Sequence, residues 1–217
     1  MILYSIDIET TGVNPETSQI LSCGIAELDT EKGLTGRTLN ILFPREQIQG
    51  TPFAINMNQD LIKLQRDYLM AGTGTRGVIL NLYGYDYAVM PYGMDWMKLD
   101  EVLYFEDKVF DFDAKSLTDI FAEFVKDPLN VTCLGKNFAS FDLQFLKRTN
   151  IFNDVKLNSR SADPAVLFFE PSDLGLPNMQ LCMDRAGVKG EVTHNALQDA
   201  IDTANVYMEG LKRLHKR

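Results

Sequence analysis

Apolar and polar residues alternate over residues 2–9, which is the pattern of a β-strand. An apolar run at 20–28 predicts a second strand, and a third follows at about 38–43. Turn-forming residues at 10–15 and 29–33 join the three strands, so we expect an antiparallel meander. The two faces of the first strand are Ile2, Tyr4, Ile6 and Ile8 on one side and Leu3, Ser5, Asp7 and Glu9 on the other.

Helical periodicity becomes frequent in the second half of the chain. The capping-box pair Ser116 and Asp119 precedes an apolar helical face. Residues 72–112 are less regular and rich in Gly, Tyr and Met, which indicates an inserted excursion in one domain, 1–217. A meander followed by alternating helices and strands predicts an α/β fold with a mixed five-stranded sheet flanked by helices. The further predicted elements are helices at about 58–70, 117–125, 140–149, 178–186 and 196–214, and short strands at 131–134 and 157–163.

The composition is that of a chain that folds around a core. Its 217 residues are 45% hydrophobic, and no window approaches the ~18–20 consecutive apolar residues of a membrane span. The first residues do not resemble a signal peptide, and Cys23, Cys133 and Cys182 lie in apolar segments. We therefore expect a cytoplasmic protein with reduced cysteines and no membrane partner.

The formal net charge of −9 narrows the classes of nucleic-acid partner. It argues against a protein that coats duplexes without specificity, because phosphate binding normally needs a basic face. It is compatible with an enzyme whose bound cations meet the phosphate.

Asp7 and Glu9 place two carboxylates on one face of the first strand. An isolated Asp-x-Glu pair is most often a solvated strand face. Here apolar Leu3 shares that face, and an opening strand in a mixed sheet is usually covered on both sides. Two unpaired carboxylates at about 4 Å repel by about 4 kcal/mol at an effective dielectric near 20, and a divalent cation reverses this penalty. Such oxygen ligands suit Mg²⁺ or Mn²⁺.

Two further acids stand near the starts of predicted helices. Asp142 falls in a first helical turn, where an acid also simply stabilises the helix dipole. Asp199 lies about one turn inside the last helix, whose expected cap is Asn195 with Gln198. His194 precedes this helix in a loop. The alternative is an exposed loop histidine beside a solvated acid, but histidine is also the side chain that most readily exchanges protons near neutral pH.

Together and in this order, the three groups resemble the motifs of the DEDDh 3′-to-5′ exonuclease family, which includes proofreading exonucleases, oligoribonuclease and phage exonucleases. Asp-x-Glu-Thr-x-Gly stands at 7–12, Asn-x-x-x-Phe-Asp-x-x-Phe-Leu at 137–146, and His-x-Ala-x-x-Asp-Ala at 194–200. Residues 175–181 also resemble the family's approach to the third motif. The resemblance covers nearly the whole chain apart from 72–112.

The resemblance implies an RNase H-like fold and hydrolysis of a nucleic acid from its 3′ end to nucleoside 5′-monophosphates, with single-stranded DNA favoured over RNA. It also implies two divalent cations, Mg²⁺ or Mn²⁺, and a histidine that takes the proton of the attacking water. The implied metal ligands are Asp7, Glu9, Asp142 and Asp199, the implied base is His194, and the implied substrate-binding residues are Thr10, Thr11, Gly12, Asn137 and Phe141.

The sequence departs from the family pattern in three places. Lys136 stands where many members have histidine, and Phe138 replaces a small residue, but neither is an implied ligand. The stretch between the first two motifs is longer than in compact members, so we expect 72–112 to influence substrate preference.

Two groups of side chains allow either of two interpretations. The aromatics of the excursion either stack on bases or, as we favour, pack on the domain. The basic tract at 212–217 either contacts phosphate or stabilises a helix end. The aromatics are Tyr83, Tyr85, Tyr87, Tyr92, Trp96 and Tyr104.

Three alternative functions remain open at this point. They are an oligoribonuclease-type RNA exonuclease, an endonuclease on the RNase H fold, and a non-catalytic nucleic-acid-binding module on the same fold. The presence of all five implied catalytic residues argues against the module, because binding alone does not require His194.

Overall fold

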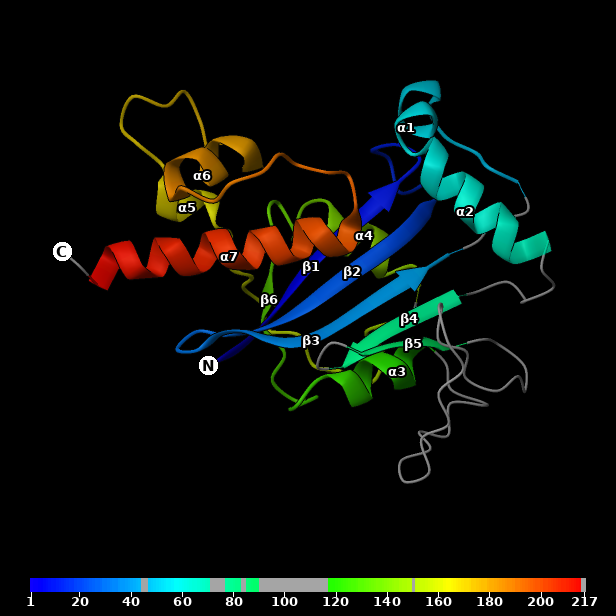
Figure 1. Cartoon of the computed structure of the whole chain (residues 1–217), viewed down its shortest axis with the longest axis horizontal. Helices are drawn as coiled ribbons and strands as arrows, with labels where there is room; N and C mark the ends of the chain where they lie inside the picture. The colour runs from blue at the N-terminus through cyan, green and yellow to red at the C-terminus, as the bar shows by residue number, and fades with distance from the viewer. Residues whose placement is uncertain (44–46, 71–76, 83–84, 90–116, 150, 216–217) are drawn as a thin grey trace.

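The computed structural model describes residues 1–43, 47–70, 77–82, 85–89, 117–149 and 151–215 (Figure 1). Its strands form one six-stranded sheet in the order β5-β4-β3-β2-β1-β6. The strands are β1 (Ile2–Thr10), β2 (Ile20–Asp29), β3 (Gly33–Leu42), β4 (Gly77–Leu82), β5 (Tyr85–Val89) and β6 (Cys133–Leu134).

The sheet is mixed because β1 has neighbours of both kinds. β1, β2 and β3 form the predicted antiparallel meander, and β6 pairs with β1 in parallel, with Tyr4 opposite Cys133 and Ser5 opposite Leu134. The predicted α/β class, a mixed sheet that begins with an antiparallel meander and is flanked by helices, is confirmed.

The residues that the structure describes form six strands instead of the expected five. Two strands of the excursion region, β4 and β5, extend the sheet beyond β3 as an antiparallel pair. The expected strand at 157–163 makes only isolated parallel bridges, Val131 with Leu157 and Leu134 with Ala162. The residues between these bridges are exposed and polar, and Asn158 donates a hydrogen bond to the side chain of Asn130 (3.0 Å).

The helix predicted at 58–70 is confirmed at Gln59–Met70, and a shorter helix that was not predicted, Pro52–Met57, precedes it. Thr51 caps the shorter helix, because its hydroxyl accepts a hydrogen bond from the backbone N–H of Ala54 (3.3 Å), and Pro52 occupies the first turn. The first helix ends at Asn58, where the second begins. The helices are α1 (Pro52–Met57), α2 (Gln59–Met70), α3 (Leu117–Phe124), α4 (Asp142–Leu146), α5 (Ala165–Phe168), α6 (Met179–Ala186) and α7 (Ala196–His215). None of these described helices is long and apolar enough to cross a membrane.

The two faces of β1 pack against different helices. Ile6 belongs to the largest apolar cluster, together with Phe121 of α3 and Phe145 of α4. Leu3, on the opposite face, clusters with Ala204 of α7, and α7 crosses the sheet over β1, β2 and β3 (Figure 1). β1 is therefore an interior strand covered on both sides, as the sequence predicts.

Some expectations concern residues outside the described part. The capping residue Ser116 and the aromatic residues Tyr83, Tyr92, Trp96 and Tyr104 belong to this group. Only the backbone of Tyr85 and Tyr87 is described, within β5.

Candidate active site

The carboxyl-terminal half of β1 carries Asp7 and Glu9 on the face that α7 covers. They alternate with Ile6 and Ile8, which point into the apolar cluster on the other side. Glu9 is 5% exposed and Asp7 is half-buried. A central strand thus presents two carboxylates in the layer between the sheet and α7.

A glycine determines how closely α7 approaches this strand. Gly24 of β2 is the cross-strand partner of Asp7. A β-carbon at position 24 would lie 2.2 Å from the backbone nitrogen of Leu197 and 2.3 Å from the carbonyl carbon of Ala196. Only glycine therefore allows the first turn of α7 to rest on β2, and this turn carries Asp199.

Hydrogen bonds at the start of α7 fix the preceding loop. Asn195 caps the helix, because its side-chain oxygen accepts from the backbone N–H of Gln198 (3.0 Å), as predicted. One carboxylate oxygen of Asp199 accepts from both the backbone N–H and the hydroxyl of Thr193, each at 3.0 Å. His194 lies between these anchors with φ 54°, a left-handed conformation that non-glycine residues rarely adopt.

The strand and the last helix together form a group of potential metal ligands. One atom each of Glu9, His194 and Asp199 lie within 4.8 Å of one another. Glu9 and Asp199 are buried, whereas His194 is exposed. In this geometry His194 can either complete a cation site or accept a proton from a molecule bound beside the carboxylates.

Asp142 reaches the same region from the opposite direction. It is 3% exposed and opens α4, which packs against β1. Its carboxylate accepts hydrogen bonds from its own backbone N–H and from that of Ile8. The side chain is thus tied to the strand between Asp7 and Glu9.

Burial and neighbouring negative charges raise the pKa values of three of these carboxyls. Burial, followed by the charges of Asp142, Glu9 and Asp199, raises the pKa of Asp7 well above its ordinary value. Burial and the charge of Asp199 raise the pKa of Glu9 to about 7, against a hydrogen bond that lowers it. Burial, with a contribution from Glu9, raises the pKa of Asp142 to about 7 despite its two hydrogen bonds. The site concentrates negative charge.

Glu27, a buried acid elsewhere in the same sheet, differs from the site acids because it has cationic partners. Glu27 is fully buried, but Arg37 lies 2.5 Å from one of its oxygens and Lys126 lies 2.8 Å from the other. Among the residues that the structure describes, no lysine or arginine forms an ion pair with Asp7, Glu9, Asp142 or Asp199. Hard oxygen donors with uncompensated charge fit divalent cations such as Mg²⁺ or Mn²⁺.

Asn58 belongs to the site although it lies outside the sequence motifs. It is 3% exposed and ends α1. Its amide donates to the backbone carbonyls of Thr10 (3.1 Å) and Ala54 (3.2 Å), and a hydrogen bond between Asn58 and Glu9 lowers the pKa of that carboxyl. The only sequence signal was its position at the start of a predicted helix.

Thr10, Thr11 and Gly12 form a closed turn after β1. The Thr10 hydroxyl donates to the Gly12 carbonyl (2.7 Å). Thr11 is fully buried, and its hydroxyl donates to the Gln49 carbonyl (2.6 Å) and accepts from the backbone N–H of Gln19 (2.8 Å). The hydroxyl of Thr11 thus fastens the turn to the segment before α1.

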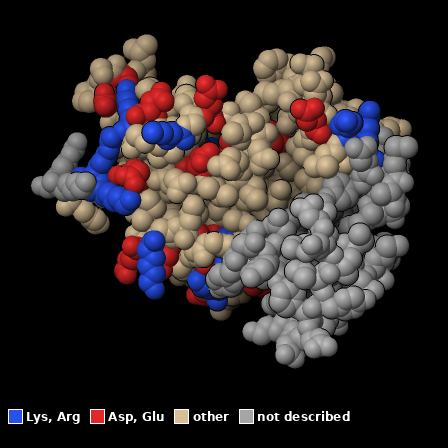
Figure 2. All heavy atoms as spheres, in the orientation of Figure 1, with Lys and Arg blue, Asp and Glu red and all other residues tan. Residues whose placement is uncertain are grey.

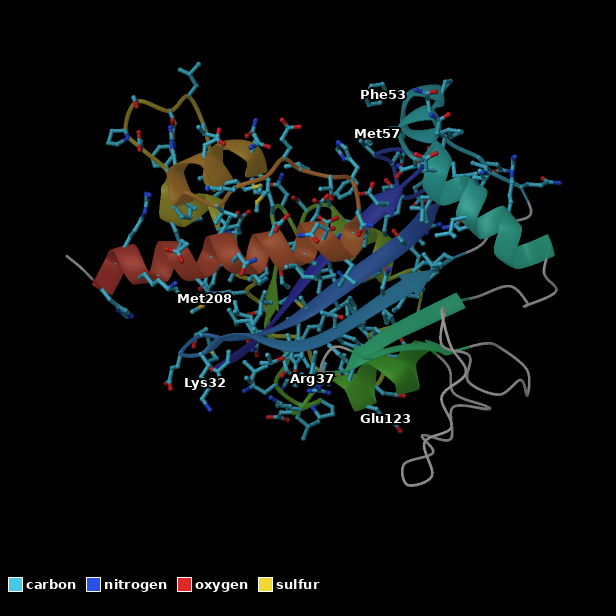
Figure 3. The ribbon with its side chains drawn as sticks, viewed as in Figure 1. Lys32, Arg37, Phe53, Met57, Glu123 and Met208 are labelled. Carbon is cyan, nitrogen blue, oxygen red and sulfur yellow. The ribbon has the colours of Figure 1, made fainter. Side chains whose placement is uncertain are left out.

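The attachment of this turn to the segment before α1 places the exposed apolar side chains of α1 near the end of β1. A β-carbon at Gly50 would lie 2.2 Å from the Thr11 carbonyl oxygen, so the segment before α1 lies directly against the turn. α1 then exposes Phe53 (79%) and Met57 (39%). Figure 3 shows both side chains on the side of α1 that is turned toward the end of β1.

The second motif supplies one exposed and one half-buried candidate. Asn137 is exposed and has φ 59°, the other left-handed non-glycine residue among those that the structure describes. Phe141 is half-buried, packs against the largest apolar cluster and lies 5.3 Å from Phe145 between ring centroids. Phe138 is 3% exposed and belongs to the same cluster.

The basic tract after the site is engaged within the protein where it is described. Lys212 pairs with Glu209 (2.6 Å), and Arg213 lies over the ring of Phe168 and donates to the Arg185 carbonyl. Residues 216–217 lie outside the described part. In the view of Figure 2, basic side chains form separate groups, one near the carboxyl end of α7 and one near α2.

The structure thus brings Asp7, Glu9, Asp142, Asp199 and His194 together at one end of β1. Solved structures with a similar fold include exonucleases. Two exonuclease I structures superpose on 99% of the chain. The moderately thermophilic exonuclease I from Methylocaldum szegediense matches with a TM-score of 0.60 at 15% sequence identity. Exonuclease I from E. coli, in complex with a dT13 oligonucleotide, matches with a TM-score of 0.56 at 13% identity.

The two comparisons define the fold of the chain. The chain spans 41% and 42% of the lengths of these two structures. No protein-family model matches the sequence, and no curated protein matches it significantly.

Proposed function

We propose that the chain is a metal-dependent 3′-to-5′ exonuclease that acts on single-stranded nucleic acid, with DNA preferred over RNA. The observation that carries this proposal is the convergence of four carboxylates and one exposed histidine at the end of β1, where no lysine or arginine of the described residues pairs with the acids. The likeness to exonuclease I supports it, because one of the two structures holds a single-stranded oligonucleotide.

Each site residue has a role in this proposal. Asp7, Glu9, Asp142 and Asp199 hold two divalent cations, Mg²⁺ or Mn²⁺, which when bound stabilise the attacking and leaving oxygens of the displacement at phosphorus. His194 takes the proton of the attacking water. The new bond joins the water oxygen to the terminal phosphorus, and the bond from phosphorus to the 3′ oxygen of the preceding nucleotide breaks. The product is a nucleoside 5′-monophosphate.

The surface around the acids supports an end of a single strand as substrate. Phe53 and Met57 are exposed on a helix that is tied to the turn after Glu9, so an unpaired terminal base can stack there without rearrangement. We assign the turn at Thr10 and Gly12, which a hydrogen bond closes, to the terminal nucleotide, and the buried hydroxyl of Thr11 positions this turn. We assign Asn137 and Phe141 to the nucleotide that precedes the terminal one.

The direct test is digestion of 5′-labelled DNA and RNA oligomers with Mg²⁺, Mn²⁺ or a chelator. We expect a ladder of products shortened one nucleotide at a time, faster for single-stranded DNA, and no products with the chelator. Asp7→Asn and His194→Ala should each lower kcat by at least about 100-fold, because each removes a group that acts at the reacting phosphorus.

Each alternative has its own signature in this assay. Cleavage of a circular single strand would indicate an endonuclease, and faster digestion of short RNA would indicate an oligoribonuclease-type enzyme. Binding of oligomers without any cleavage would indicate the non-catalytic module. Activity that both substitutions leave unchanged would contradict the assigned roles.

A further inference from the structure

Lys136 and Asn137 follow β6, the parallel neighbour of β1. Because parallel strands end at the same edge of a sheet, these residues lie at the edge where β1 carries its acids. The backbone N–H of Gly135 donates to the Ala162 carbonyl (3.0 Å), which joins this edge to the segment before α5. The side chain of Lys136 is only 16% exposed, an uncommon state for a lysine.

Three hydrogen bonds hold Asn137 in its left-handed backbone conformation. Its backbone N–H donates to Asp163 (3.0 Å), and its carbonyl accepts from the hydroxyl of Ser140 (3.0 Å). Its side-chain oxygen accepts from the ammonium of Lys136 (2.9 Å). Among the described residues, no acceptor binds the side-chain NH₂ group, which is exposed.

The ammonium of Lys136 is also held in place, and it has N–H donors that make no hydrogen bond among the described residues. It donates to Asn137 and lies 3.9 Å from Asp163, whose other oxygen accepts from the backbone N–H of Ala165 (2.8 Å). An ammonium has three donors and no acceptor. Ordering a lysine side chain costs about 1.5–2 kcal/mol, so the arrangement orders donors that a free surface lysine would leave mobile.

The unused groups are all donors, and their natural partner is an anion. A phosphodiester offers only acceptors and one negative charge, which suits an ammonium beside an amide. We propose that Lys136 and Asn137 together bind the phosphodiester one position to the 5′ side of the scissile bond. This inference rests on the exonuclease function proposed above.

The position of the pair determines which phosphate it meets. The terminal base is assigned to α1, and α5 and α6 lie across the amino-terminal end of α7 from α1 (Figure 1). Lys136 belongs to the α5 and α6 side, because Asp163 directly precedes α5 and the charge of Lys136 acts on the pKa of Cys182 in α6. A strand that leaves the acids away from α1 therefore passes the pair.

The test compares two substrates that share the scissile phosphate. Thymidine 5′-(4-nitrophenyl phosphate) has no phosphodiester beyond the scissile one, whereas the trimer TpTpT has one. For Lys136→Gln we expect the KM of the trimer to rise about 10-fold, because one charge-assisted contact is lost. The KM of the ester should not change. The dependence of log KM on log salt should weaken by about 0.7 for the trimer. Lys136→Arg should retain most of the trimer activity.

A neutral methylphosphonate at the upstream linkage of the trimer locates the contact. This replacement should raise the KM of the wild type by about the same factor, and it should not raise the KM of Lys136→Gln any further. Lys156→Gln is the matched control, since this exposed lysine has no side-chain partner among the described residues, and its kinetics should equal those of the wild type.

Two results would overturn the inference but not the proposed function. One is a rise in KM for Lys136→Gln that is equal for the ester and the trimer. The other is a methylphosphonate effect on KM that is as large in Lys136→Gln as in the wild type. A wild type that hydrolyses neither substrate would overturn the proposed function, and the inference with it.

Discussion

Asn58 connects three parts of the site through one buried amide. It binds the carbonyl of Thr10 at the end of the strand, the carbonyl of Ala54 in α1 and the carboxylate of Glu9. Each bond opposes a different motion, of the turn, of the helix and of the ligand. Asn58 is thus a positioning residue that acts through Glu9.

For Asn58→Ala we expect a melting temperature several degrees lower and Mn²⁺ affinity about 10-fold to 100-fold weaker. Buried carbonyls lose a donor at a cost of ~1–3 kcal/mol, and partners of metal ligands contribute to affinity on this scale. Calorimetry and Mn²⁺ titration measure the two effects. Asn153→Ala, at an exposed asparagine without a side-chain partner among the described residues, is the control. Unchanged Mn²⁺ affinity would contradict the role.

At this scale, residue spacing predicted the acids but not their supports. Asp7, Glu9, Asp142 and Asp199 are recognisable because each stands within one of three short motifs. Asn58 contacts Glu9 across a distance of 49 positions, and no local pattern reports such a contact. The burial of the Thr11 hydroxyl is equally non-local, since it depends on Gln49.

Among the elements, α7 and β2 have the contact that most directly controls the site. The helix begins with a capped turn that carries Asp199, and the strand offers a position without a side chain at Gly24. The separation between Asp199 and Asp7 therefore depends on one missing methyl group.

For Gly24→Ala we expect loss of at least about 1–3 kcal/mol of stability, from overpacking against the backbone of Leu197. Activity should fall about 100-fold or more in the fraction that remains folded, because displacements near 1 Å have such effects. Thermal melting and digestion rates measure both. Gly175→Ala, where a β-carbon would meet no atom within 4 Å, should match the wild type. If Gly24→Ala also matches the wild type in stability and activity, this contact does not determine the position of α7.

Element prediction was accurate where periodicity was long. The meander and α7 have many repeats of one period, so their type and approximate bounds were predictable. α1 has six residues, too few to show a helical period, and was not predicted. The segment 157–163 pairs only at Leu157 and Ala162, because the residues between them are polar and mostly exposed.

For the whole molecule, the titration of the site acids is linked to the stability of the fold. The pKa values of Glu9 and Asp142 are about 7 in the folded protein, above their ordinary values of 4.5 and 3.8. The folded state therefore binds more protons than the unfolded state between these limits. Raising the pH through this interval removes protons that stabilise the fold.

We accordingly expect the melting temperature of the metal-free protein to fall between about pH 4.5 and pH 7 and then to level off. Added Mg²⁺ should raise it, most strongly above pH 7, where protons no longer compete for the carboxylates. Scanning calorimetry with and without a chelator measures both effects, and Asp7→Asn should reduce each. A melting temperature that rises over this interval, or that ignores Mg²⁺ at about pH 8, would show that the acids are not coupled in this way.

The distance along the chain between β1 and α7 has a consequence for the newly made protein. Asp7 and Asp199 stand 192 positions apart, and at ~5–20 residues per second the ribosome adds them roughly 10–40 s apart. During that interval the first acids have no fourth carboxylate and no histidine beside them. Under the proposed function, the nascent chain thus has no complete cleavage centre while it is surrounded by ribosomal and messenger RNA, and it acquires one only after α7 has emerged.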